Sequence, residues 1–348
     1  MRSKVIIFIF STLFLFSCGD GSRTLPSVTG TKYEILVVMN DANWKAPSGR
    51  SLVALLDQDT PELPQPEAIM NISRCKLMDF SDLLKPTRNI LLTDISEKYT
   101  KPKVIYSTDR WAYPQTVVQV VAPNDSVFTE TIKQYGENIL NYFLDSERNR
   151  QISFNKEYVN TTIKNQIDSI FGVQIDIVQG FKVVKKTNDF FWLSNDSPDK
   201  RQDIVIYSYP YTDKNTFTKD FILEKRDSVM KAGILGEFEG SHMGTEYKYE
   251  PPIFKEVWVN DGYCAEVRGL WKMKNGGAMG GPFFSHTRLD EINQRVITME
   301  GFVFAPGTKK RNLIRQLEAM IYSAKLPQEI NSLKEVSIVA KKDDTKKK

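Results

Sequence analysis

The residues best suited to chemistry lie between Tyr263 and Glu291. Glu266 and Arg268 share one face of a strand-like run, and His286 follows with Arg288 in the segment S-H-T-R-L-D-E. A carboxylate, a guanidinium and an imidazole together can bind a polar ligand, or a carboxylate and a histidine can act as acid and base. Because glycosidases leave no local signature, hydrolysis of a glycan or peptide by Glu266 and His286 stays an alternative.

The densest glycine cluster of the chain lies between these groups, at positions 276, 277, 280 and 281. Glycine permits tight turns, so a flexible hairpin connection is the favoured interpretation. The alternative is an adaptable apolar pocket or lid, since methionine conforms to irregular partners. The candidate ligand-binding set therefore contains Glu266, Arg268, Trp271, Met273, Met279, Phe283, His286 and Arg288.

Several kinds of site are excluded by spacing. The glycine cluster has no Gly-Lys-Ser/Thr ending and no G-x-G-x-x-G, so it is not a nucleotide loop. The two histidines, His242 and His286, are far apart and neither forms a zinc-protease motif. We therefore expect no metal and no cofactor, we assign no catalytic residue, and we favour a binding protein over an enzyme.

A second candidate site is the basic run Lys309, Lys310 and Arg311. It occupies the first turn of an expected helix, where the helix dipole disfavours cations. A bound anion would offset this repulsion through the free N–H groups of that turn. An exposed, screened basic face is the simpler alternative.

The N-terminus has the features of a bacterial lipoprotein signal. Arg2 and Lys4 precede an apolar run from Val5 to Phe16, and the run ends in Leu-Phe-Ser-Cys at Cys18. The run is too short to span a bilayer and suits a signal peptide. We expect residues 1–17 to be removed and Cys18 to carry the lipid that attaches the protein to the membrane.

The charge of the chain gives no sign of nucleic-acid binding. Loss of the leader lowers the formal net charge from +4 to +2, and the last eight residues carry +3, which leaves a body near −1. Beyond Cys18 only Cys75 and Cys264 remain, and two separate reduced thiols are expected.

Hydrophobic periodicity predicts an α+β protein with antiparallel sheets covered by helices. The expected divisions are a tether (18–32), an N-terminal half (33–180), a C-terminal half (181–330) and a disordered basic tail (331–348). Both halves can be written β-α-β-β-β-α, and A-P-N-D-S near residue 122 is echoed by A-P-G-T near residue 305. This indicates two related halves, although a strand followed by Ala-Pro and a helix is a common arrangement.

Several segments together resemble a lipoprotein family of the Bacteroidota whose function is unknown. They are K-Y-E-I-L-V-V-M, D-I-V-I-Y-S-Y-P-Y-T-D-K-N-T-F-T, R-G-L-W-K-M and M-G-G-P-F-F-S-H-T-R-L-D-E, and the resemblance covers residues 30 to 327. It implies a cell-envelope location and brings no activity or catalytic residue. The residues after Cys18 are only weakly acidic, which favours the periplasmic side of the outer membrane.

The sequence thus predicts a lipid-anchored, non-enzymatic envelope protein that binds a ligand or partner. An envelope protein, a lipid or a glycan would each suit the Gly/Met-rich region. A hydrolase using Glu266 and His286 is the alternative, and a purely structural role is a third.

Overall fold

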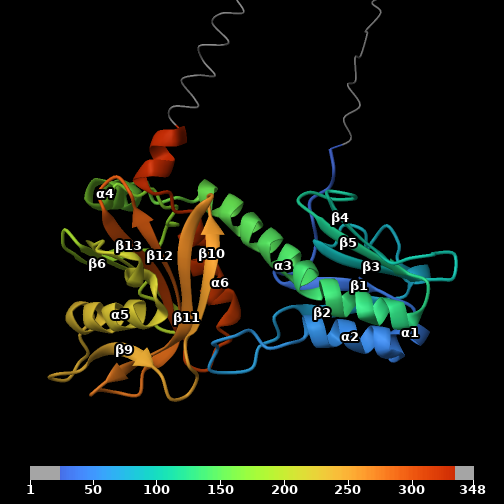
Figure 1. The fold of residues 1–348 in the computed structure, drawn as a ribbon, viewed down its shortest axis with the longest axis horizontal. Helices are drawn as coiled ribbons and strands as arrows, with labels where there is room; N and C mark the ends of the chain where they lie inside the picture. Colours follow the sequence, from blue (N-terminus) through green and yellow to red (C-terminus); the bar gives the residue numbers. More distant parts are fainter. Residues whose placement is uncertain (1–23, 334–348) are drawn as a thin grey trace, which may run out of the picture.

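A computed structural model describes residues 24–333 of the 348-residue chain. The expected signal peptide, the lipidated Cys18 and most of the basic tail lie outside the described residues. The chain forms two units that lie side by side, each with its own sheet, and the long helix α3 (Asp125–Glu157) runs from one to the other (Figure 1).

The N-terminal unit contains a five-stranded mixed sheet in the order β2-β1-β3-β5-β4. The first four strands in this order are parallel, and only the edge strand β4 is antiparallel to its neighbour. Central strands of a parallel sheet are buried on both faces, which explains their nearly continuous apolar runs. The strands are β1 (Glu34–Val38), β2 (Asn71–Cys75), β3 (Asn89–Ile95), β4 (Lys103–Thr108) and β5 (Thr116–Ala122).

Helices cover one face of this sheet. They are α1 (Asp41–Lys45), α2 (Pro47–Leu56) and the first half of α3, and they enclose a core that includes Val37, Leu52 and Phe128. The Asn124 side chain caps α3 by accepting a hydrogen bond from the Val127 N–H at 3.0 Å. The opposite face is covered by loops and by the short 3₁₀ helix η1 (Leu77–Asp79).

The C-terminal unit contains an eight-stranded antiparallel sheet. Its main order is β10-β11-β12-β13-β8-β7-β6, and β9 pairs with the far end of β11. The strands are β6 (Lys182–Lys186), β7 (Phe190–Ser194), β8 (Arg201–Pro210), β9 (His242–Glu246), β10 (Ile253–Val259), β11 (Gly262–Lys274), β12 (Gly280–Asp290) and β13 (Arg295–Phe304).

The two faces of the C-terminal sheet carry separate cores. Helix α5 (Lys219–Gly233) follows the 3₁₀ helix η2 (Lys214–Phe217) and covers one face. Helices α4 (Thr161–Phe171) and α6 (Arg311–Tyr322) cover the other. Side chains at successive positions of β11 and β12 therefore enter different environments.

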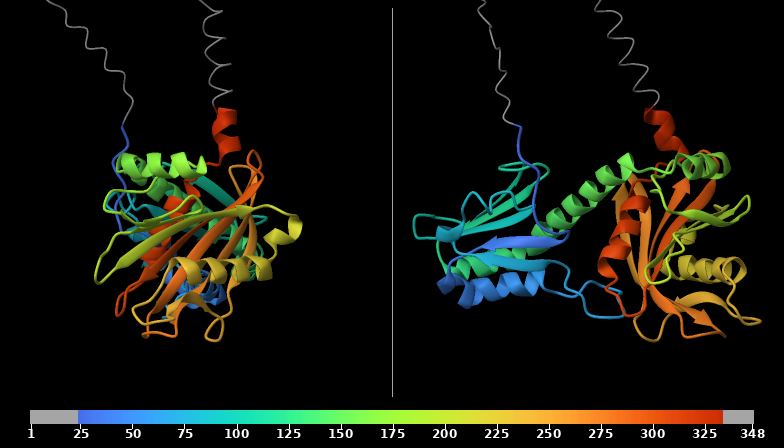
Figure 2. Two further views of the ribbon diagram at one scale, coloured as in Figure 1. Left: turned by 90° about the vertical axis from the view of Figure 1, so that its left-hand side faces the viewer. Right: turned by 180° about the vertical axis from the view of Figure 1, so that it is seen from behind.

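The units are joined by α3 and by the proline-rich segment 57–68. This segment leaves the N-terminal unit after α2 and reaches the C-terminal unit, as Figures 1 and 2 show, and its Leu63 is part of the core beneath α6. The apolar stripe of α4 (Ile163, Ile167 and Phe171) packs in that same core. The boundary between the two units therefore lies between α3 and α4, and not at residue 180 as expected. Hydrophobic periodicity can indicate a helix, but it does not show which sheet the helix packs against.

The α+β class is confirmed, with a refinement. The C-terminal sheet is antiparallel as expected, whereas the N-terminal sheet is mostly parallel because β1, β3 and β5 return through crossovers. Strand order and direction differ between the sheets, so the two halves do not repeat one topology. The Ala-Pro echo is a local pattern at the end of a strand.

Three smaller features complete the fold. Asn260 and Asp261, both with positive φ, form the two-residue turn between β10 and β11. Cys75 and Cys264 lie in different units and are free thiols. Within residues 24–333, no helix is both long and apolar enough to cross a membrane.

Candidate functional site

The eight predicted ligand-binding residues divide between the two faces of the C-terminal sheet. Strand β12 contains part of the predicted glycine-rich connection and the polar segment that follows it. It pairs with β11, so that Glu266 lies opposite His286 and Arg268 opposite Phe284. Four of the eight lie on the α6 face and four on the α5 side. They do not form one site.

The apolar members of the set lie on the α5 side. Trp271 is buried, and its indole N–H donates to the Val303 carbonyl oxygen at 3.1 Å. Together with Met273 and Met279 it lines a pocket of about 210 Å³. Phe283 lies apart from that pocket, under the guanidinium of Arg226 at 3.8 Å.

A buried ion pair that no sequence motif indicates lies on the same face. Arg226 of α5 donates from Nε to Glu300 Oε2 at 2.8 Å and from Nη2 to Glu300 Oε1 at 2.6 Å, and both side chains are buried. The only local clue is an arginine among the apolar positions of α5. Because each charge is paired within the core, the Arg226–Glu300 ion pair has a structural role.

The polar members converge beneath α6 as a buried cluster. Glu266 accepts hydrogen bonds from Arg268 Nε at 2.8 Å and from the Tyr322 hydroxyl at 2.8 Å, and His286 Nε2 lies 3.3 Å from its Oε2. Arg268 also donates to Glu318 of α6 at 2.6 Å. The sequence analysis correctly grouped Glu266, Arg268 and His286. It could not identify Tyr322 and Glu318, which lie about 50 residues further along the chain.

The electrostatics of this cluster do not suit acid–base catalysis. Burial would raise the pKa of Glu266, but Arg268 and the hydrogen bond from His286 hold that pKa well below its usual range. Burial lowers the pKa of His286, against the opposing effect of Glu266. The carboxylate is thus ionised and the imidazole neutral at pH 7. Glu266 is 4% exposed and His286 fully buried, and neither lines a described pocket.

Arg288 has a structural position at the other end of the α6 face. Its Nη2 donates to the Val259 carbonyl at 3.0 Å and pairs with Glu329, while Nη1 reaches the Ala324 carbonyl. Arg288 therefore ties the β10–β11 turn to the segment after α6.

The basic run at the start of α6 does face an anion, but one supplied by the chain itself. The Glu67 carboxylate accepts hydrogen bonds from the Lys310 N–H at 2.6 Å and the Arg311 N–H at 3.1 Å. The Lys310 ammonium donates to Gln65, and Arg311 donates to the Ala68 carbonyl. The predicted external anion is therefore not needed at these backbone groups, because segment 57–68 occupies them. Lys309 lines a shallow polar pocket beside them.

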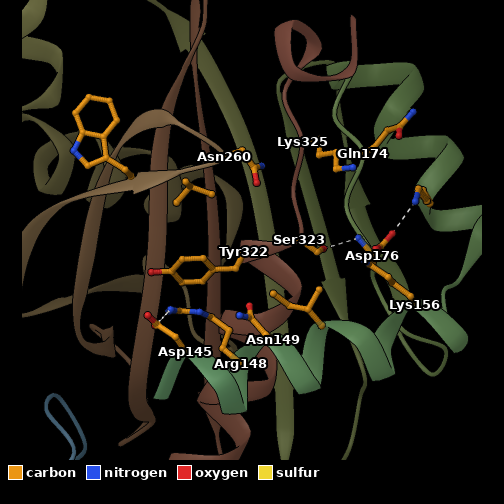
Figure 3. Close-up of a pocket in the computed structure, with 14 residues that line it drawn as sticks. Asp145, Arg148, Asn149, Lys156, Gln174, Asp176, Asn260, Tyr322, Ser323 and Lys325 are labelled. Carbon is orange, nitrogen blue, oxygen red and sulfur yellow. Dashed lines mark hydrogen bonds and ion pairs between the residues drawn. The ribbon is translucent and has the colours of Figure 1, made fainter. Parts of the chain in front are cut away.

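The best candidate for a binding site is a pocket of about 430 Å³ where α3 passes the C-terminal unit. Its walls come from α3, the segment 174–176, the β10–β11 turn and the end of α6. Figure 3 shows Tyr322 between Asn260 and the Arg148–Asp145 pair of α3. The Arg148 guanidinium lies 3.8 Å from the centre of the Tyr322 ring, so Tyr322 connects this pocket with the Glu266 cluster.

Backbone contacts fix the rim of this pocket. Gln174 and Lys325 exchange two backbone hydrogen bonds of 3.0 and 2.8 Å, and the Asp176 N–H donates to the Ser323 hydroxyl at 2.9 Å. The Asn260 amide donates to the Ala324 carbonyl at 3.2 Å. The pocket is thus formed before any ligand binds.

The lining is polar and carries an excess of positive charge. Lys164 pairs with Asp176 at 2.7 Å, whereas Lys156 and Lys325 form no ion pair with any residue in the described range 24–333. Trp258 also contributes to the lining, but its ring lies beside Tyr263 on the α5 side of the sheet, with 6.4 Å between the ring centres. Over residues 24–333 no group of acidic, His or Cys side chains could hold a metal ion.

The fold and this pocket define a two-unit α+β protein with a polar site between α3 and the C-terminal sheet. Comparison with known families gives the same division: residues 28–156 match a domain of unknown function (DUF8532), and residues 160–323 match a second domain of unknown function (DUF4837). The predicted similarity to proteins of unknown function is confirmed. No curated protein matches the chain.

Solved structures add only distant likenesses. The Ran-binding protein Mog1p of Saccharomyces cerevisiae has 8% sequence identity and a TM-score of 0.30, over 44% of this chain and 90% of that chain. A crystal structure from Bacteroides thetaiotaomicron VPI-5482 has 11% identity and a TM-score of 0.24, over 44% of each chain. At these TM-scores the likenesses carry no argument about function.

Proposed function

We propose that this protein is a lipid-anchored binding protein of the bacterial cell envelope, and that the pocket between α3 and the C-terminal sheet holds an acidic carbohydrate. The observation that carries the proposal is the composition of the pocket wall. Two lysines, Lys156 and Lys325, have no carboxylate partner among the described residues, and they line the pocket together with the amide side chains of Asn149, Gln174 and Asn260.

A sugar that carries a carboxylate matches this wall in two respects. Asn149, Gln174 and Asn260 offer both donors and acceptors, as hydroxyl groups require. The lysines can pair with a carboxylate on the ligand. A purely apolar ligand such as an acyl chain would leave these polar groups unpaired.

The envelope location rests on the leader and Cys18. We propose that the lipid on Cys18 holds the protein at the outer membrane, facing the periplasm. The first and last described residues lie on the same side of the molecule (Figure 1), so attachment there leaves the rest of both units facing away from the membrane. Acidic glycans, including the peptidoglycan strand, are abundant in that compartment.

The test is calorimetric titration of the purified protein with muramyl dipeptide, a glycopeptide that carries one free carboxylate. Lys325→Gln and Lys156→Gln should each weaken binding about tenfold, since each removes one cation from the pocket wall. Two controls change residues outside the pocket: Lys133→Gln on the exposed face of α3 and Tyr249→Ala at an exposed loop.

The controls should bind like the wild type, and chitobiose, which lacks the carboxylate, should bind more weakly. Equal affinity in the wild type, Lys325→Gln and Lys156→Gln would remove the pocket as the site.

A further inference from the structure

A second pocket lies in the N-terminal unit, at the edge where the parallel strands begin. Its volume is about 240 Å³. Lys32 and Tyr33 precede β1, Arg88 precedes β3 and Pro114 precedes β5, so parallel pairing brings all of them to one edge. The second half of α3 closes the pocket with Glu147, Arg150, Gln151 and Phe154.

The charges lining this pocket do not balance. Glu147, the one carboxylate in the lining, is buried and already accepts hydrogen bonds from Arg88 Nε at 2.8 Å, Arg150 Nη2 at 2.8 Å and the Asn89 amide at 2.7 Å. Lys32 donates instead to the neutral Gln151 Oε1 at 2.6 Å. Three cations therefore share one carboxylate.

Among residues 24–333, no nearby carboxylate makes up the difference. Glu34, which influences Arg88 from further away, is turned towards Thr31 and Ser73 and accepts hydrogen bonds from both. Burial, followed by repulsion from Arg88, lowers the pKa of Lys32. Burial likewise lowers the pKa of Arg150. The three cations are thus partly removed from water, and one carboxylate does not neutralise their charge. A bound anion would supply the missing negative charge.

Donors remain available on all three cations. Arg150 has a side chain only 10% exposed, and its Nε is buried without a hydrogen-bond partner among the described residues. Arg88 donates to Glu147 through its Nε and Nη2, so its Nη1 takes no part in this pair. The Lys32 ammonium has three hydrogens, one of which is given to Gln151.

We propose that this pocket binds a phosphate-type oxyanion. Two guanidinium groups and an ammonium supply the charge and the several donors that a tetrahedral phosphate accepts. The apolar side chains of Val28, Pro114 and Phe154, which complete the wall, suit the organic part of a phosphate ester. The pocket is separate from the glycan site and needs neither that site nor its ligand.

The phosphate has two available sources. One is a soluble phosphate or phosphate ester, and the other is a phospholipid headgroup. Val28 is ten residues after Cys18, and ten extended residues span at most about 35 Å. The headgroup source, and only that source, rests on the proposed lipid anchor, which would keep the pocket within reach of the membrane surface.

The first experiment titrates the full-length protein with inorganic phosphate by calorimetry, at constant ionic strength set with chloride. Binding should saturate, and Lys32→Gln should weaken it about tenfold. Lys32 contacts a neutral glutamine, so the variant is expected to fold. Lys32→Arg keeps the charge and should restore binding, and Lys133→Gln on the exposed part of α3 is the matched control.

The second experiment separates the sources by flotation with phosphatidylglycerol vesicles, using the Cys18→Ser protein so that no lipid is attached. Vesicle binding that Lys32→Gln reduces and inorganic phosphate inhibits identifies the headgroup. Saturable phosphate binding without Lys32-dependent flotation identifies a soluble phosphate. If neither probe shows binding that depends on Lys32, the proposal is overturned.

Discussion

Glu62 is the residue whose titration depends most directly on the contact between the two units. It lies in segment 57–68, is 3% exposed, and one of its carboxylate oxygens is buried without a hydrogen-bond partner among the described residues. Burial raises the pKa of Glu62 from 4.5 to about 7, while Arg268 and Arg315 oppose this shift and Glu250 and Glu318 add to it. The protonated form is therefore the one that fits the C-terminal unit.

This raised pKa predicts a stability that falls with pH. Because the folded pKa is above the unfolded one, the contribution is complete below pH 4.5 and is lost as the pH rises through about 7. Glu62→Gln is a neutral isostere, so at pH 8 the variant should exceed the wild type in unfolding free energy by on the order of 2 kcal/mol. At pH 5 the two should be nearly equal. Urea unfolding at both pH values, with Glu130→Gln as the control, measures this, and an equal difference at both values would contradict it.

A second residue-scale prediction concerns the cap of α6. Glu67→Ala removes the acceptor for the Lys310 and Arg311 backbone N–H groups and the negative charge at the positive end of the helix dipole. We expect a loss of about 1–2 kcal/mol in the free energy of unfolding. Glu130→Ala, at an exposed position of α3, should change it by less than about 0.5 kcal/mol. Similar losses in both variants would show that Glu67 is not a cap.

At the scale of elements, the glycine cluster has two different roles. Gly276 and Gly277 lie in the connection between β11 and β12, and a side chain at Gly277 would meet no atom within 4 Å. Gly281 lies within β12, where an added Cβ would collide with the Val303 carbonyl oxygen of the neighbouring strand. The packing therefore requires a glycine at position 281 and does not require one at position 277.

Two alanine variants separate these roles. Gly281→Ala must push β12 away from β13 and should cost about 2 kcal/mol or more in stability. Gly277→Ala should be neutral within about 0.5 kcal/mol. Thermal unfolding of both proteins checks the difference, and equal melting temperatures would mean that the strand pair adjusts freely.

The same strand explains what the sequence could and could not predict. Hydrophobic periodicity predicted the α+β class and the antiparallel sheet of the C-terminal unit. Strand β12 was missed because Gly280, Gly281 and Pro282 read as a turn, and proline is rare in a central strand. Strand β9 was also missed, because it lies in a glycine-rich stretch.

The site was harder to predict than the fold. Alternation placed Glu266 and Arg268 on one face correctly, but their partners Tyr322 and Glu318 come from a helix that sequence spacing cannot locate. The Glu67 cap connects residues more than 240 positions apart. Contacts of this kind depend on how separate elements pack, and a single sequence does not show that packing.

At the scale of the whole molecule, α3 is the element that makes both proposed sites. Its first half covers the N-terminal sheet, and its second half forms a wall of the glycan pocket through Arg148 and Asn149 and of the phosphate pocket through Arg150 and Gln151. Successive residues of one helix face different sides, so neighbouring positions serve different pockets. The two pockets can therefore be changed separately by mutation.

The central claim is that the pocket between α3 and the C-terminal sheet binds an acidic carbohydrate. A crystal structure of the protein with muramyl dipeptide, at a concentration that saturates the calorimetric signal, tests it most directly. We predict ligand density within this pocket, with a carboxylate near Lys325 or Lys156. Density at any other position, or an empty pocket at saturation, would contradict the account.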